Sequence, residues 1–160
     1  MAQYNHILLA ADFNDESEIV VQRARMLQEG HQCKLSIIHV IEPMGVVAES
    51  IINSYVPDDD RRYLREQGLA DVLSKIKGQV IQTITEDYMD ILKTVALGEV
   101  MVELGHPAQT IINQALKGGS QILVLGSHGQ SAFQGGPMGS VVTKVMQLSP
   151  IPVLMVPMMT

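Results

Sequence analysis

Five short apolar runs, separated by stretches with helical periodicity, limit the folds open to this chain. The runs are rich in Leu, Ile and Val and span 6–11, 34–41, 100–104, 122–125 and 152–156. Most of them lack the polar alternation of a half-exposed strand, which is typical of strands covered on both faces. The third run, which contains Glu103, fits this pattern least well. We therefore predict five strands in a sheet whose two faces are both buried.

Helical patterns fill the intervals between these runs. Four segments are predicted to be helical: 16–30, 58–96, 107–119 and 139–150. The second contains Gly68 and Gly78, so it is either one broken helix or two. Strands that alternate with helices imply right-handed βαβ units and a parallel sheet. The segment 43–57 fits neither element and is either a flap beside the ligand-binding edge or an ordinary surface loop or short helix.

Composition and charge limit the classes of function. The 160 residues suit a single domain over 1–160, and their formal charge of −6 argues against a nucleic acid as partner. No apolar run approaches the roughly 18–20 residues that cross a bilayer, and the amino terminus does not resemble a signal peptide. The single cysteine, Cys33, fits a reducing compartment and a role as a small apolar filler. We expect a cytoplasmic protein without a membrane partner.

The carboxyl ends of the predicted strands are where an open parallel sheet binds ligands, at the point where the strand order reverses. Asp12 follows the first strand and Gly126 ends the fourth, so the two would flank that point if these strands are neighbours. Gly129 follows closely, and after nine more residues Gly139 and Ser140 open the last helix. A helix N-terminus offers free N–H groups and a favourable dipole to an anion. The spacing therefore favours a site for a phosphorylated ligand.

Plainer interpretations of the same residues stay open. The glycine segment could be a flexible strand-to-helix loop, and Asp12 could cap a helix that starts near Asn14. A Ser-His-Asp set of Ser140, His128 and Asp12 is disfavoured, because Ser140 falls at a helix N-terminus rather than on a strained nucleophile turn. The P-loop, dinucleotide and metalloprotease motifs are absent from the sequence. We expect no catalytic residues and no dedicated metal ligands.

The complete glycine spacing carries a resemblance to a known family. The pattern Gly126-x2-Gly129-x9-Gly139-Ser140, with Asp12 at the end of the first strand, is similar to that of the ATP-binding branch of the universal stress protein family. The resemblance covers almost the whole chain, although 43–97 has little to match. It implies a flavodoxin-like or Rossmann-like α/β sheet, related to the adenine nucleotide alpha hydrolases, with helices on both faces and the strand order 3-2-1-4-5.

The resemblance also implies how an adenine nucleotide would be held. The adenine and ribose pocket would be lined by strand-end residues: Ala10, Ala11, Asp12, Val40 and, beneath them, Leu125. The ribose and α-phosphate would be approached by Gly126, His128 and Gly129. The β- and γ-phosphates would be held by Gly139, Ser140, Val141 and Val142. Family members often carry Ser or Thr in place of Val142, so one hydroxyl contact to phosphate is expected to be missing.

The predicted function is a regulatory one in the stress response, through binding of ATP, or of ADP or AMP, with Mg²⁺ or Mn²⁺ on the phosphates. The alternative is an enzyme that uses the same cleft, either a slow ATPase or a phosphotransferase. The last run, about Pro152 to Val156, is predicted to be an edge strand, and the resemblance implies a homodimer through it. Three methionines, Met155, Met158 and Met159, are expected to pack on this strand and at that interface. A downstream protein partner is expected but not identified.

Overall fold

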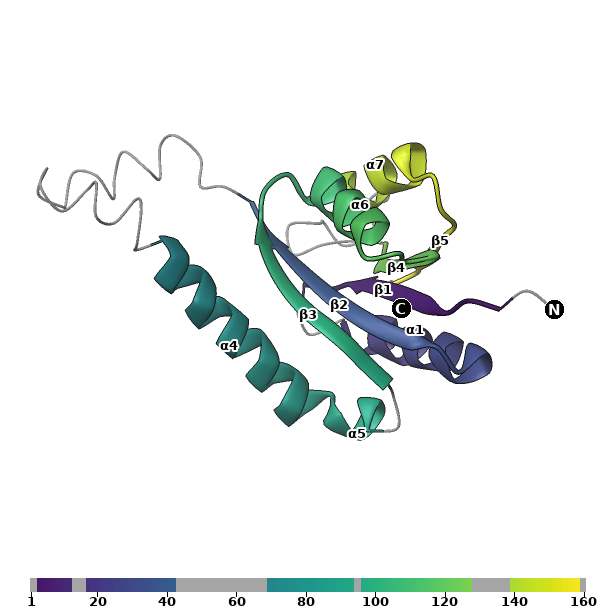
Figure 1. Cartoon of the computed structure of the whole chain (residues 1–160), viewed down its shortest axis with the longest axis horizontal. Helices are drawn as coiled ribbons and strands as arrows, with labels where there is room; N and C mark the ends of the chain where they lie inside the picture. The colour runs from purple at the N-terminus through teal and green to yellow at the C-terminus, as the bar shows by residue number, and fades with distance from the viewer. Residues whose placement is uncertain (1–2, 13–16, 43–68, 94–95, 128–138, 159–160) are drawn as a thin grey trace, which may run out of the picture.

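A five-stranded parallel sheet forms the centre of the computed structural model, which describes residues 3–12, 17–42, 69–93, 96–127 and 139–158 (Figure 1). The strands are β1 (His6–Ala10), β2 (Lys34–Ile41), β3 (Ala96–Leu104), β4 (Ile122–Gly126) and β5 (Val153–Val156). Each neighbouring pair is parallel. The order across the sheet is β3-β2-β1-β4-β5, which confirms the predicted fold class and strand order.

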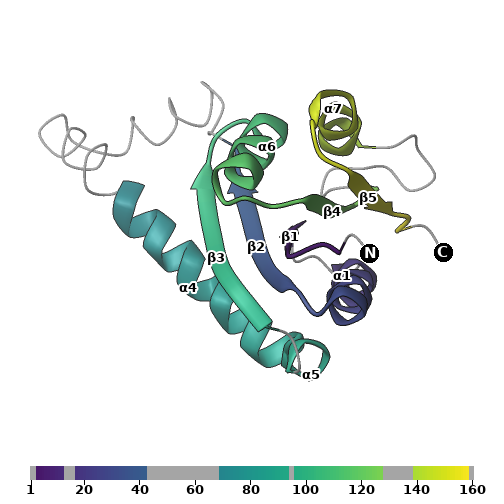
Figure 2. The same ribbon diagram turned by 45° about the vertical axis from the view of Figure 1, so that its right-hand side comes forward.

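Helices cover both faces of this sheet (Figure 2). They are α1 (Ser17–His31), α4 (Leu69–Asp87), α5 (Met89–Leu92), α6 (Pro107–Lys117) and α7 (Ser140–Leu148). The helices α1, α4 and α5 pack on one face, and α6 and α7 pack on the other. The bounds of α1, α6 and α7 agree closely with the predicted helices. The predicted segment 43–57 and the first part of the predicted helical segment 58–96, residues 58–68, lie outside the described residues.

The boundary between the second predicted helical segment and the third strand is corrected by the structure. Gly78 does not interrupt α4; the break comes at Tyr88, whose carbonyl accepts hydrogen bonds from the N–H groups of Ile91 and Leu92. Tyr88 is buried, so tertiary packing rather than glycine ends this helix. The strand β3 then begins at Ala96, earlier than predicted. Its first residues include Gly98 and Glu99 and so do not form a continuous apolar run in the sequence.

A register shift explains the unusual start of β3. Leu35 of β2 pairs with Leu97, whereas Ile37 pairs with Val100, so β3 carries one extra residue between these pairs. Such a bulge leaves an amide without its ladder partner. Here the N–H of Glu99 donates to Ser36 Oγ at 3.2 Å. A side-chain hydroxyl thus replaces the missing carbonyl.

Two apolar cores lie on the two faces of the sheet. Alternate residues of β1 point to opposite faces: Ile7 and Leu9 pack with α1 and α4, and Leu8 packs with α6 and α7. All three side chains are fully buried. The predicted burial of the sheet on both faces is therefore confirmed for the central strand.

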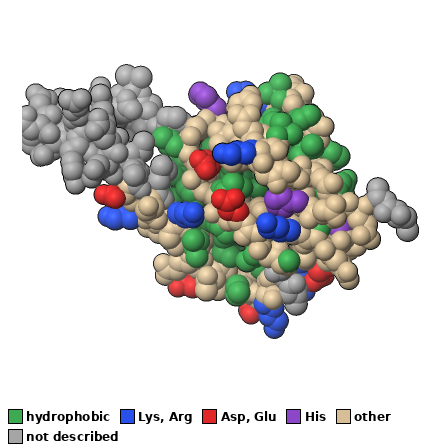
Figure 3. All heavy atoms as spheres, viewed as in Figure 1, with side chains coloured by type: hydrophobic (Ala, Val, Ile, Leu, Met, Phe, Trp, Pro, Cys, Tyr) green, Lys and Arg blue, Asp and Glu red, His purple; other side chains and the backbone are tan. Residues whose placement is uncertain are grey.

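The surface of the described residues is mixed in character. β5 lies at one edge of the sheet, as predicted, and β3 lies at the other, with α4 running alongside it (Figure 1). Lys, Arg, Asp and Glu side chains are spread over the face seen in Figure 3 and do not gather into one basic patch. None of the helices in the described part of the chain combines the length and apolar character needed to cross a membrane.

Candidate functional site

A cavity of about 510 Å³ opens at the carboxyl ends of β1 and β4. Ala10 of β1 pairs with Leu125 of β4, and β2 pairs with β1 on its other side, so the strand order reverses here. This is the position at which open α/β sheets bind ligands. The volume lies within the range of about 300–1,000 Å³ that is usual for small-molecule sites. The predicted adjacency of the first and fourth strands is confirmed.

Every predicted site residue that the structure describes lines this cavity. They are Ala10, Ala11, Asp12, Val40, Leu125, Gly126, Gly139, Ser140, Val141 and Val142. The other two predicted residues, His128 and Gly129, lie outside the described residues. The structure thus brings together segments that are far apart in sequence: the ends of three strands and the beginning of α7.

Further lining residues were not predicted. They are Ser17, Val20, Ile38, His39, Ile41, Glu42, Pro107, Ile111 and Met158. His39 and Ile41 immediately flank the predicted residue Val40, so their place at the end of a strand could have identified them. Met158 and the α6 residues gave none, because only the folded chain brings them to this edge.

The wall formed by β1 and β2 is held by hydrogen bonds beyond the end of β1. The N–H of Ala11 donates to the carbonyl of Ile38 at 3.1 Å, which continues the pairing past Ala10. His39 Nδ1 and the carbonyl oxygen of Ala11 are 2.9 Å apart, so Nδ1 carries the proton that it donates. His39 therefore fixes the backbone next to Asp12. We interpret His39 as a structural residue of the cavity wall.

The N-terminus of α7 forms the opposing wall. The N–H of Gly139 donates to the carbonyl of Ser127 at 2.8 Å, so this amide already has an acceptor within the chain. The amides of Ser140, Val141 and Val142 are in the first turn, where a helix supplies no acceptor of its own. Its N-cap residue, Gly139, has no side chain that could cap the helix. An anion in the cavity would therefore meet these three amides and the Ser140 hydroxyl. Gly139 would contribute to anion binding only through its small size, which lets the anion approach the helix.

The electrostatics of the described lining are acidic. Asp12 and Glu42 contribute carboxylates, and the described lining contains no Lys or Arg. A phosphate here would depend on backbone N–H groups and on the helix dipole rather than on a cationic side chain. No cluster of three or more metal-ligating side chains occurs among the residues described.

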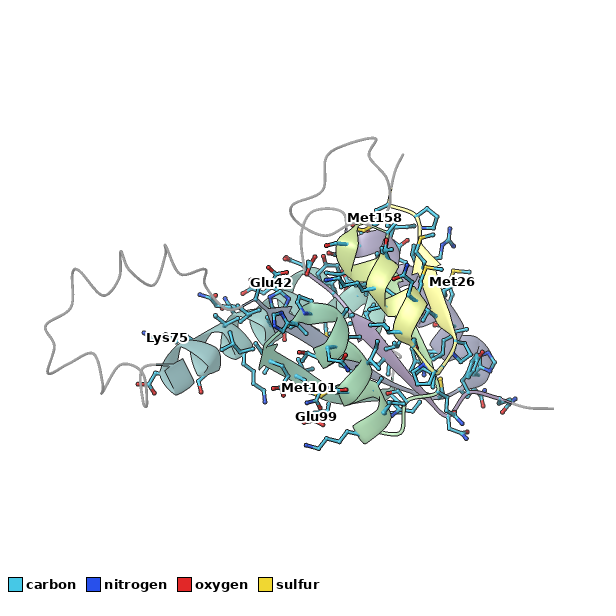
Figure 4. All side chains as sticks on the ribbon, turned by 90° about the horizontal axis from the view of Figure 1, so that it is seen from above. Met26, Glu42, Lys75, Glu99, Met101 and Met158 are labelled. Carbon is cyan, nitrogen blue, oxygen red and sulfur yellow. The ribbon has the colours of Figure 1, made fainter. Side chains whose placement is uncertain are left out.

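The glycine motif suggests that a ligand lies next to Gly126, but in the structure the neighbour of Gly126 is the side chain of Met158. A Cβ added there would overlap Met158 Sδ and would lie 3.2 Å from Val20 Cγ2. The absence of a side chain at this strand end thus makes room for Met158, which returns from the end of β5. Met158, which was expected to pack on the last strand and at an interface, also lines the cavity. In Figure 4 the labelled Met158 and Glu42 lie toward the same end of the sheet, away from Glu99.

Cys33 and His106 are not among the residues that line the cavity. Cys33 is a buried core residue, as predicted, and burial raises the pKa of its thiol. His106 is the residue before α6. Of the disfavoured Ser-His-Asp set, Ser140 and Asp12 line the same cavity, and His128 lies outside the described residues.

Comparisons with known proteins agree with this fold. The sequence model of the Universal stress protein family matches residues 3–157. Universal stress protein YxiE of Bacillus subtilis is 32% identical over 158 residues, covering 96% of this chain and 99% of that protein. The solved structure of universal stress protein UspA from Lactobacillus plantarum superposes with a TM-score of 0.71 at 20% identity and covers 98% of this chain and 99% of that one.

A further solved structure is that of a universal stress protein in complex with cAMP. It has a TM-score of 0.59 and 21% identity, and it covers 98% of this chain and 99% of that one. At these identities, the two solved structures establish the fold alone. The match to the family model and the identity to YxiE go further. The chain belongs to the universal stress protein family.

Proposed function

We propose that this protein binds an adenine nucleotide, ATP or its relatives ADP and AMP, in the cavity at the carboxyl ends of β1 and β4. One observation carries the proposal: the described lining joins the ends of the central strands to the first turn of α7, where a helix supplies no acceptor for its own amides. This combination suits a ligand with an apolar, flat end and an anionic end. The cAMP complex of a related fold supports the choice of an adenine nucleotide.

The ligand would lie across the cavity with its two ends on different walls. Ala11, Asp12 and Val40 would surround the adenine and ribose above Leu125. The phosphates would point to the amides of the first turn of α7. Because Asp12 and Glu42 are acidic, free ATP would be repelled, and a divalent cation carried on the phosphates would offset that repulsion. The chain supplies no described carboxylate cluster for this ion, so the phosphates would hold it.

We further propose a regulatory role in the cytoplasm as a homodimer, rather than efficient catalysis. Phosphoryl transfer depends on cationic groups that stabilise the charge of the transferred phosphoryl group, and the described lining offers none. A nucleotide that joins the strand ends to α7 would instead change the surface offered to a partner protein. Slow ATP hydrolysis in the same cavity is the alternative.

The test begins with the purified protein. Denaturation followed by chromatography and mass spectrometry identifies any nucleotide that was carried through purification. Calorimetric titration with ATP, ADP and AMP, with and without Mg²⁺, then gives the affinities. Micromolar or tighter binding of at least one of them is expected, and binding of none would contradict the proposal.

The location of the site is tested with Gly139→Val. Gly139 has φ −60° and ψ 156°, which valine readily adopts, so the variant is expected to fold. Its added methyl groups would obstruct a phosphate at the start of α7, and we expect nucleotide affinity to fall at least tenfold. Gly30→Val is the matched control, because nothing lies within 4 Å of a Cβ added at Gly30. Equal affinity in both variants would place the ligand elsewhere.

A further inference from the structure

Met158 is a buried apolar side chain inside the candidate nucleotide site. It is 8% exposed and lines the cavity together with Gly126 and Val20. Its Sδ lies directly over the Cα of Gly126, where even a Cβ would overlap it, and its Cγ would be 3.1 Å from that Cβ. The space beside Gly126 that a side chain at this position would fill is therefore occupied by Met158.

The backbone of Met158 is held in place by hydrogen bonds that involve Ser127, the residue after β4. Its N–H donates to Ser127 Oγ at 3.1 Å, and the N–H of Ser127 donates to the carbonyl of Val156 at 2.9 Å. The carbonyl of Ser127 in turn accepts from the N–H of Gly139 at 2.8 Å. Ser127 is itself buried. One residue thus ties the end of β4, the beginning of α7 and the segment after β5 together.

The side chain of Met158 is the part of this arrangement that can change position without breaking the backbone hydrogen bonds. Methionine is unbranched and has three rotatable bonds, so it can leave a contact without movement of its backbone. Leaving the contact with Gly126 and Val20 would expose apolar surface to water, which opposes the movement. The backbone hydrogen bonds to Ser127 do not depend on where the thioether lies.

We infer that Met158 is an affinity-determining residue of the nucleotide site, whose side chain the ligand displaces from the face of Gly126. The inference rests on the proposed function, which places the nucleotide in the cavity that Gly126 and Met158 both line. A nucleotide that reaches the face of Gly126 would need the space that the thioether of Met158 occupies. The free energy of removing Met158 from its pocket is subtracted from that of nucleotide binding.

Substitution of Met158 gives the first test. Met158→Ala removes the competing atoms, and we expect ATP with Mg²⁺, or whichever nucleotide binds most tightly to the unaltered protein, to bind about tenfold more tightly. Met158→Leu keeps a similar apolar volume and is expected to stay near the affinity of the unaltered protein. Met146→Ala is the matched control, because Met146 is 47% exposed on α7, outside the cavity. Unchanged or weaker binding by Met158→Ala would overturn the inference.

A second test uses the unaltered protein and does not depend on the folding of a variant. Dilute hydrogen peroxide oxidises exposed methionine to the sulfoxide, and peptide mass spectrometry reports the rate at each methionine. If the nucleotide displaces Met158, its oxidation accelerates when the nucleotide is bound, while that of Met146 stays constant. Slower oxidation of Met158 would show that it remains buried against the ligand, which would overturn the inference. Failure of the unaltered protein to bind any nucleotide would instead contradict the proposed function, and the inference with it.

Discussion

At the scale of single residues, Ser36 joins three strands through one hydroxyl group. Ser36 lies on β2 and is buried; its Oγ accepts from the N–H of Glu99 on β3 and is 2.7 Å from Nε2 of His6 on β1. His6 Nδ1 lies 3.1 Å from the carbonyl of Gly118, to which it donates, so Nε2 accepts the Ser36 proton. Without Ser36, the N–H of Glu99 and Nε2 of His6 would lose these hydrogen-bond partners.

Ser36→Ala is therefore expected to destabilise the protein. The substitution leaves a bulge amide and a ring nitrogen without their partner, which costs about 1–3 kcal/mol in the free energy of unfolding. Urea denaturation followed by circular dichroism measures the change. Ser74→Ala on the exposed surface of α4 is the control and should alter stability by less than about 0.5 kcal/mol. Equal stability of the two variants would show that the network contributes nothing.

Cys33 supports a prediction about reactivity. Burial raises the pKa of its thiol, so at a given pH less of it is thiolate, which is the reactive form. We expect iodoacetamide at pH 8 to modify the folded protein far more slowly than the protein unfolded in urea, with the rate rising as the pH is raised. Intact mass spectrometry over time gives both rates. Rapid modification of the folded protein would contradict the burial of Cys33.

At the scale of elements, the two glycines Gly78 and Gly98 have opposite roles. Gly78 lies on the exposed surface of α4, and a Cβ there meets nothing within 4 Å. Gly98 lies at the bulge of β3, and a Cβ there would be 2.5 Å from Ser36 Oγ and 2.6 Å from Lys34 Cε. We predict that Gly78→Ala raises the free energy of unfolding by about 0.5–1 kcal/mol and that Gly98→Ala lowers it by about 1–3 kcal/mol.

Thermal and urea unfolding of the two variants, side by side, checks both signs. The pair controls itself, because each variant adds the same methyl group to the same protein. A loss of stability in Gly78→Ala would mean that α4 is not an exposed helix at that position. A gain in Gly98→Ala would mean that the bulge does not bring β3 against Ser36.

Most elements were predictable from the sequence, but two boundaries were not. Sequence patterns located β1, β2 and β4 because each is a short apolar run buried on both faces, and α1, α6 and α7 because each buries an apolar stripe against the sheet. The strand β3 was predicted too short, since Gly98 and Glu99 belong to a bulge that only the pairing with β2 creates. The end of α4 was also missed, because burial of Tyr88 rather than a glycine interrupts the helix.

At the scale of the whole molecule, chain order and motif spacing predicted the cavity but not its complete lining. A parallel sheet must bring the end of β1 and the end of β4 to one edge, so Asp12 and Gly126 could be placed in one site. The position of Met158 depends on where the chain returns after β5, and the engaged amide of Gly139 depends on the carbonyl of Ser127. Neither contact leaves a local signal in the sequence.

The proposed homodimer can be tested through the backbone of β5. The N–H of Leu123 donates to the carbonyl of Pro152, and the N–H of Ser127 donates to the carbonyl of Val156. Backbone groups alternate in direction along a strand. The odd-numbered residues of β5, including Met155, therefore direct their N–H and C=O groups away from β4. These are the groups that a second copy would bind if two β5 edges pair.

Met155→Pro removes one outward N–H and leaves the hydrogen bonds between β5 and β4 in place. We expect light scattering at micromolar concentration to give twice the mass of the chain for the unaltered protein and the mass of a single chain for Met155→Pro. Met155→Ala is the matched control: it shortens the same side chain but keeps the N–H, and it should remain dimeric. Since Met155 is partly buried beneath α7, circular dichroism must show that both variants are folded.

A monomeric unaltered protein would contradict the dimer itself. A dimeric Met155→Pro would mean that the two copies meet through another surface, because an edge that lacks this donor cannot complete the pairing.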